Sequence, residues 1–164
     1  MDTLNPGIQS RMHYGLPFGI GVVAGLRSLT APAVVALTAY FGWLNLKGSS
    51  LAFMGSLPAV IIFSVLAIAE LIGDKLPTTP KRTALAPLLA RIVSGALCGA
   101  CLCASGGQPL TVGAILGGIG ALIGAFGGYE IRRRLVTNLG LKDFIFAIGE
   151  DMVAIALAFF VVAR

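Results

Sequence analysis

The chain has 164 residues, of which 57% are hydrophobic and only 12% are charged, and its formal net charge is +5 at pH 7. An ordinary soluble domain has about 25% charged residues. A mean hydropathy of +0.92 therefore excludes a soluble globular enzyme and a disordered chain. The basic residues lie at the ends of apolar runs and form no extended stripe, which excludes a nucleic-acid-binding module. The composition predicts a single integral membrane domain that comprises residues 1–164.

Five apolar stretches follow one another along the chain, each long enough to cross the hydrocarbon layer of a bilayer. A crossing takes about 20 residues, because a helix rises about 1.5 Å per residue and the layer is about 30 Å thick. The stretches are residues 16–44, 51–73, 85–104, 109–131 and 144–163. The sequence therefore predicts an all-α polytopic membrane protein with about five transmembrane helices.

The first stretch is too long for a simple crossing, since its 29 residues would reach roughly 43 Å as a straight helix. It must tilt strongly or break. Residues 25–32 offer a flexible glycine, hydroxyl groups that cap helices, and Pro32, which suits the first turn of a new helix. We expect one crossing that is kinked or broken in this region, and the alternative is a re-entrant or two-helix segment.

Charge orients the predicted crossings. If each stretch crosses once, eight basic residues lie on the side of the N-terminus and two on the other side. The eight are Arg11, Lys75, Lys81, Arg82, Arg132, Arg133, Arg134 and Lys142, and the two are Lys47 and Arg164. Because basic residues collect on the cytoplasmic side, this bias predicts a cytoplasmic N-terminus and an external C-terminus in a bacterial inner membrane.

A weak internal similarity relates residues 16–84 to residues 85–140, with residues 144–163 left as a last helix. The alignment places Arg27 opposite Arg91 and brings Glu70 near Glu130. Each unit would be a two-helix hairpin, so the two copies would be parallel.

Ionisable residues lie inside the apolar stretches or at their inner edge, where each costs about 2.5–3.5 kcal/mol at the centre of a span. They are Arg27, Glu70, Arg91, Glu130, Glu150 and Asp151. We expect them to converge in the cytoplasmic half, with Arg27 and the backbone around Ser28 and Thr30 at the floor of a polar cavity. A helix that begins near Thr30 would direct its N–H groups into that cavity, which suits an anion. The alternative is that the charges only pair with one another and fix helix positions.

Glycines recur at spacings of three and four along the fourth stretch, which lets another helix backbone approach closely. They are Gly113, Gly117, Gly120, Gly124 and Gly127, and Gly21, Gly25, Gly95 and Gly99 repeat the four-residue spacing elsewhere. This pattern predicts glycine-rich helix packing within the chain, with the seam of a homodimer or higher homo-oligomer as the alternative.

No cofactor or metal site is predicted. Cys98 and Cys101 form a C-x-x-C pair within an apolar helix, which favours packing over redox or metal chemistry. His13 is the only histidine, which excludes a histidine-based metal site or catalytic triad within one chain. Six basic residues are interpreted first as charges that orient the chain in the membrane, and the second interpretation is that they bind an anionic lipid head group. They are Lys75, Lys81, Arg82, Arg132, Arg133 and Arg134.

Several motifs together resemble the bacterial membrane family called domain of unknown function 4126. They are GLRSLTAP at 25–32, ELIGDKLP at 70–77, ARIVSGA at 90–96, GGYEIRRR at 127–134, and Glu150 with Asp151. The resemblance covers roughly residues 15–163 and implies a small polytopic membrane protein. It carries no catalytic or binding residue over to this chain.

The residues favour a small carrier or channel subunit for an ion or a small polar solute, which acts as a homo-oligomer. Five short spans leave little room to enclose a pathway in one chain. The alternative function is a non-transporting structural or lipid-interacting membrane protein whose charges are helix clamps. An intramembrane enzyme ranks third, because carboxylates are present without a nucleophile, a metal set or a cofactor motif.

Overall fold

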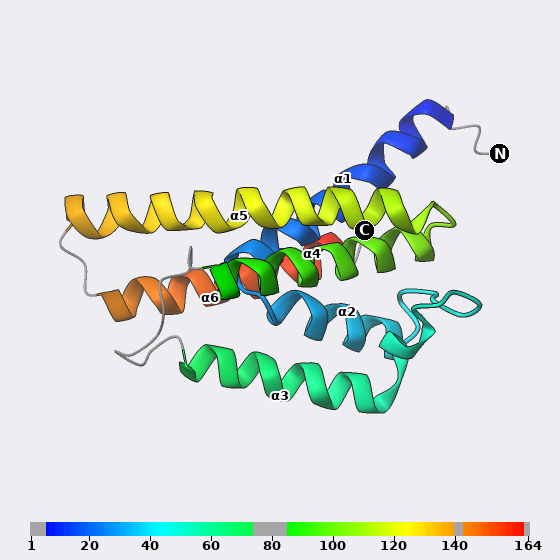
Figure 1. The fold of residues 1–164 in the computed structure, drawn as a ribbon, viewed down its shortest axis with the longest axis horizontal. Coiled ribbons are helices and arrows are strands. Elements are labelled where there is room, and N and C mark those ends of the chain that lie inside the picture. Colours follow the sequence, from blue (N-terminus) through cyan, green and yellow to red (C-terminus); the bar gives the residue numbers. More distant parts are fainter. Residues whose placement is uncertain (1–5, 74–84, 140–142, 163–164) are drawn as a thin grey trace.

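The computed structural model describes residues 6–73, 85–139 and 143–162, without the side chains of residues 6–13, 135–139, 143–148, 150 and 151. Within these ranges the chain is all-α, as the sequence predicts (Figure 1). The helices are α1 (Pro6–Leu26), α2 (Thr30–Tyr40), the short 3-10 helix η1 (Ala52–Gly55), α3 (Leu57–Gly73), α4 (Leu85–Ser105), α5 (Leu110–Leu139) and α6 (Asp143–Val162).

The first apolar stretch is broken where the sequence predicts, because α1 ends at Leu26 and α2 begins at Thr30. The chain also reverses direction there (Figure 1). Near the start of α1, the hydroxyl of Tyr14 donates to Oε1 of Gln108 at 3.2 Å, and beyond the end of α2 the N–H of Asn45 donates to Oγ of Ser105 at 3.1 Å. Both ends of the stretch therefore lie beside the turn between α4 and α5.

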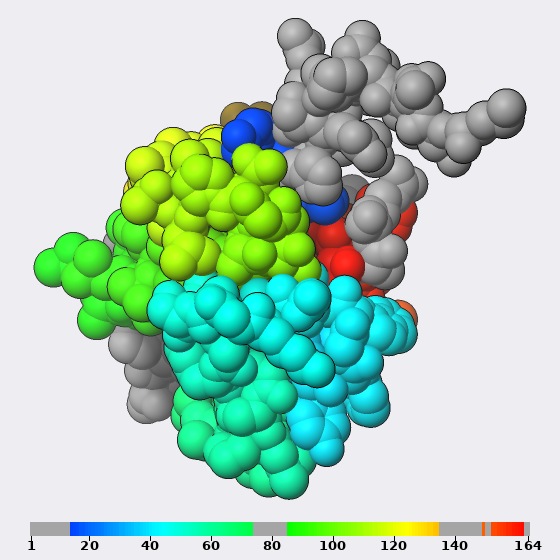
Figure 2. Space-filling view, turned by 90° about the vertical axis from the view of Figure 1, so that its right-hand side faces the viewer, coloured from blue at the N-terminus to red at the C-terminus, as the bar shows by residue number. Residues whose placement is uncertain are grey.

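The structure does not confirm that residues 16–44 cross once, because the chain folds back at the break and both ends of the stretch lie at the same end of the molecule. The physical reason is the break itself: a glycine, two hydroxyl residues and a proline end one helix and start another, and nothing local keeps the second helix in line with the first. The excess length of the stretch is used to fold back rather than to tilt. Figure 2 looks onto the end where the residues after α2, in cyan, lie beside the start of α5, in yellow-green.

Helices α1, α4 and α5 form the tightest part of the molecule, and α5 packs along both of the others. Glycines stand at the points of contact. A methyl group on Gly117 would collide with the backbone of Gly95, and one on Gly120 would collide with the backbone of Phe18. Glycine normally weakens a helix by about 1 kcal/mol relative to alanine. Here it allows three helix backbones to come together, and these glycine faces are occupied within the chain.

The remaining helices surround this group unequally. Helix α6 packs against α1 and α2, with Ala154 and Ala158 fully buried. Helix α3 lies outermost, against α2 and η1, and buries only Ala59 and Ala67 among its residues. Several of its large aliphatic side chains, among them Ile62 and Val65, are more than half exposed. An apolar surface of this kind suits hydrocarbon better than water.

Two of the described helices are long and apolar enough to cross a membrane, namely Leu85–Ser105 and Leu110–Arg134. Shorter apolar segments are Tyr14–Leu26, Thr30–Tyr40, Leu57–Gly73 and Met152–Val162. Helix α5 continues past the ends of α3 and α4 (Figure 1). Length and composition thus fit a membrane environment for α4 and α5.

Candidate functional site

The break between α1 and α2 is the place where most of the residues predicted for the polar cavity meet. A helix end leaves up to four N–H or four C=O groups without partners inside the helix, and in an apolar interior these groups must be satisfied by other parts of the chain. Two helix ends meet at the break, the carbonyl end of α1 and the N–H end of α2. Both receive side chains from distant helices.

Glu70, near the end of α3, satisfies the start of α2. Its Oε1 accepts the N–H of Ser28 at 2.9 Å and the hydroxyl of Ser28 at 2.5 Å, and its Oε2 accepts the N–H of Leu29 at 2.9 Å. The N-cap residue of α2, Leu29, has no capping side chain of its own. A carboxylate at this end also matches the positive end of the helix dipole. Glu70 thus occupies N–H donors at the start of α2, where the sequence favours an anion.

Arg91, in the first half of α4, satisfies the end of α1. Its Nη1 donates to the carbonyl oxygen of Gly25 at 2.5 Å and to that of Leu26 at 2.8 Å. The side chain is 3% exposed. A guanidinium suits this position because the end of a helix carries negative partial charge. The break is therefore held by an acid on one helix end and a base on the other.

Arg27 lies between these two contacts and is 0% exposed, the largest side chain buried to this degree. Arg27 interacts with other groups of the chain. Ser28 and Thr30 are also buried, so the break forms a polar region inside an apolar molecule. Sequence reasoning identified Arg27, Ser28, Thr30, Glu70 and Arg91 as candidates, and the structure brings all five together.

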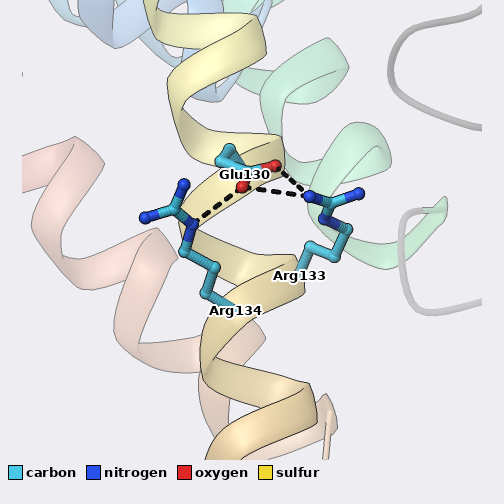
Figure 3. A network of polar contacts seen from close by, with 3 residues as sticks. All are labelled: Glu130, Arg133 and Arg134. Atoms are coloured by element: carbon cyan, nitrogen blue, oxygen red, sulfur yellow. Dashed lines mark hydrogen bonds and ion pairs between the residues drawn. The ribbon is translucent and has the colours of Figure 1, made fainter.

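Glu130 lies elsewhere. Its carboxylate contacts Nε of Arg134 at 2.7 Å and Nη2 of Arg133 at 3.1 Å, both on the next turn of α5 (Figure 3). The side chain of Arg133 is 62% exposed and that of Arg134 is 73% exposed. In the part of the chain that is described, these contacts place Glu130 in a surface cluster with Arg133 and Arg134 rather than at the break, and Arg132 stands beside the cluster in sequence.

Other predicted residues lie outside the described structure. The side chains of Glu150 and Asp151 are among them, although the backbone at both positions belongs to α6. Lys75, Lys81 and Arg82 fall in residues 74–84, which are also outside the description. The suggested internal alignment pairs Arg27 with Arg91, but Arg27 stands between two helices and Arg91 stands inside α4.

The hollows on the described surface include two that are not lined by Arg27, Glu70 or Arg91. The larger, of about 500 Å³, lies at the connection between α2 and α3. The smaller, of about 200 Å³, is an apolar groove between α2, α3 and α6 that includes Thr30 and Ser64. No sequence signal pointed to either.

The cysteines contribute packing. Cys98, Cys101 and Cys103 are free and buried along α4. Among the described residues, histidine, cysteine, aspartate and glutamate nowhere gather in a group of three or more that could hold a metal ion.

Comparison with known proteins places the chain in a family. Residues 15–163 match the family described as domain of unknown function DUF4126, and the chain belongs to it. No curated protein and no solved structure matches the chain. The family description assigns no activity, so the site itself must carry any functional argument.

Proposed function

We propose that this member of the DUF4126 family is a small integral membrane carrier or channel subunit for an ion or a small polar solute, with the break between α1 and α2 as its solute site. The observation that carries the proposal is the complete burial of Arg27 at an interrupted helix. Charged residues inside apolar helices are costly, and broken helices in membrane proteins commonly surround solute and ion sites.

The contacts at the break suggest a division of roles. Glu70 and Arg91 hold the two helix ends at fixed positions, since their hydrogen bonds end on backbone groups. Arg27 then supplies the charge that meets the solute, with the hydroxyls of Ser28 and Thr30 beside it. Glu150 and Asp151 are candidates for coupling a proton or cation to transport, because α6 packs against both α1 and α2.

The reversal at the break changes the proposed orientation in the membrane. The start of α1, the end of α2 and the turn between α4 and α5 share one end of the molecule, and Gly19 of α1 lies against Val161 near the end of α6. By their positions in the sequence, we assign Arg11, Lys47 and Arg164 to this end and seven basic residues to the opposite end. The seven are Lys75, Lys81, Arg82, Arg132, Arg133, Arg134 and Lys142.

By the positive-inside rule, we place the end of α5 in the cytoplasm and both termini outside a bacterial inner membrane. This replaces the cytoplasmic N-terminus expected from five single crossings and keeps the external C-terminus. Helix α2, with 11 residues, reaches only about 16 Å and enters the membrane without crossing it alone. Epitope tags at either terminus should be accessible from outside intact cells, and a tag after Lys81 should not.

A homo-oligomer stays part of the proposal, because a chain of 16.9 kDa offers few helices to line a pathway. The glycine faces of α1, α4 and α5 are used inside the chain. The outward face of α3 is therefore the surface we assign to contact between copies.

The second candidate function is a non-transporting structural or lipid-interacting protein in which the charges are clamps. It is favoured by the same hydrogen bonds of Glu70 and Arg91, which satisfy helix ends and need no solute. In this case Arg132, Arg133 and Arg134, with Lys75, Lys81 and Arg82, would bind anionic lipid head groups.

Flux in proteoliposomes separates the two functions. Wild type, Arg27→Lys and Arg27→Met should be compared across a panel of small anions and cations, with thermal stability measured on the same preparations. A carrier loses flux in Arg27→Met even where the protein stays folded, and Arg27→Lys retains part of it because the charge is kept. Absence of flux and of ion binding in wild type would remove the transport proposal.

A further inference from the structure

The larger hollow is a second place where the molecule can hold a ligand, at the end opposite to the cluster of Glu130. It lies where α2 leads through residues 41–56 into α3, and its volume of about 500 Å³ is within the range of about 300–1,000 Å³ usual for small-molecule sites. Its lining residues come from the end of α2, the following loop and η1. None of them belongs to the break.

The walls of this hollow are fixed by the fold. Leu44 and Leu46 are buried and anchor the loop in the core. The N–H groups of Trp43 and Leu44 donate to the carbonyl oxygen of Thr38 at 2.9 and 3.3 Å, and Gly42 turns the chain with a φ of +81°. The N–H of Asn45 is tied to Ser105 on α4. A ligand would therefore meet a preformed surface, which lowers the entropy cost of binding.

The chemistry of the lining is amphipathic and positively charged. Lys47 is its one charged residue, and no acidic residue is among the lining side chains. Lys47 forms no ion pair within the part of the chain that is described. Tyr40 and Phe41 supply aromatic rings that meet edge to face at 5.6 Å, and Asn45 adds a polar amide. Such a set fits a ligand with one anionic group next to a hydrocarbon portion.

The surroundings of the hollow indicate which ligand of this kind it meets. Tyr40, Phe41 and Trp43 are each 47–66% exposed around it, and exposed aromatic residues of this kind collect where hydrocarbon meets water. We propose that the hollow binds the phosphate-bearing head group of an anionic membrane lipid, with Lys47 on the phosphate and the lipid chains passing Phe41. This inference concerns another surface than the proposed solute site and does not depend on transport.

The single tryptophan of the chain, Trp43, stands between the lining residues Gly42 and Leu44 and is a fluorescent probe at the edge of this hollow. The protein would be placed in two sets of phosphatidylcholine nanodiscs. One set contains phosphatidylglycerol with brominated chains, and the other contains phosphatidylcholine with brominated chains. Quenching of Trp43 emission would be measured against the fraction of brominated lipid in each set. We expect stronger quenching by brominated phosphatidylglycerol. In Lys47→Met the preference should fall by about fivefold, the value of one basic group near a charged lipid surface.

Three further variants keep the proposal open to refutation. Lys47→Arg should retain the preference, Ala52→Phe should reduce it by filling the hollow with the charge unchanged, and Tyr129→Phe at the far end should leave it as in wild type. Equal quenching by the two lipids in wild type, or an unchanged preference in both Lys47→Met and Ala52→Phe, would overturn the inference. Loss of the preference on adding inorganic phosphate alone to the nanodiscs would assign the hollow to a soluble anion instead and overturn it as well.

Discussion

The break between α1 and α2 and the far end of α5 contain the same kinds of charged side chain in different surroundings. At the break, Arg91 is 3% exposed and its donors end on backbone carbonyls. At the end of α5, Arg133 and Arg134 are mostly exposed and meet a carboxylate on their own helix. Buried hydrogen bonds to charged groups are costly to lose, whereas ion pairs in water are worth little. Burial, more than residue type, decides which charges the fold depends on.

Replacement of Arg91 should give the largest effect. Arg91→Met keeps the volume but leaves the carbonyls of Gly25 and Leu26 without their donor, and each orphaned carbonyl costs roughly 1–3 kcal/mol. We expect a clear loss of thermal stability in detergent. Arg133→Met is the matched control, and similar melting temperatures for the two variants would contradict the difference in burial.

Helix α5 joins the two regions and allows a matched test along one helix. Gly117→Ala would push a methyl group into the backbone of Gly95, whereas Gly127→Ala meets nothing within 4 Å. Overpacking of this kind costs about 1–3 kcal/mol. The first variant should be destabilised, and the second should be equal to wild type or slightly more stable. If both behave alike in thermal unfolding, α5 does not pack as closely as described.

Glu70 should show an intermediate effect. Glu70→Gln keeps the shape but offers one acceptor oxygen where Ser28 and Leu29 present three donors. We expect a loss of about 1–2 kcal/mol in the free energy of unfolding. Hydrogen exchange should rise at the amides of Ser28 and Leu29, and unchanged protection of both amides would show that Glu70 does not hold the start of α2.

The smallest effect is expected at Glu130. Glu130→Gln weakens contacts with Arg133 and Arg134 that water already screens. Thermal stability should equal that of wild type within the error of the measurement. A loss as large as that of Glu70→Gln would show that the two regions do not differ in the way their exposure indicates.

The sequence allowed the position of the break to be predicted, because its signals are local: Gly25, Ser28, Thr30 and Pro32 lie within one short segment. The direction of α2 could not be predicted in this way. It depends on contacts such as that of Asn45 with Ser105, which is 60 residues distant in the chain. The spacing of glycines along α5 indicated that other helices approach it closely, but it did not identify α1 and α4 as those helices.

The partners of the break show the same limit. Charge inside apolar stretches identified Glu70 and Arg91 as candidates, either for a polar cavity or for pairing with other charges, and neither expectation gave these two residues helix ends as partners. The structure instead directs Glu70 to the N–H groups of Ser28 and Leu29, and Arg91 to the carbonyls of Gly25 and Leu26. The unpaired N–H and C=O groups at helix ends are strong partners for charged side chains in an apolar interior. They can be identified only once the helix boundaries are known.

Access of water to the break tests the central claim most directly. Ser28→Cys should be exposed to a membrane-impermeant thiol reagent in folded protein in proteoliposomes, with Ala158→Cys in α6 as a buried control and the buried native cysteines as background. A solute site must open to water during transport, so the account predicts modification of Ser28→Cys and none of Ala158→Cys. If Ser28→Cys reacts only after the protein is unfolded, the break is a dry clamp and the carrier proposal is contradicted.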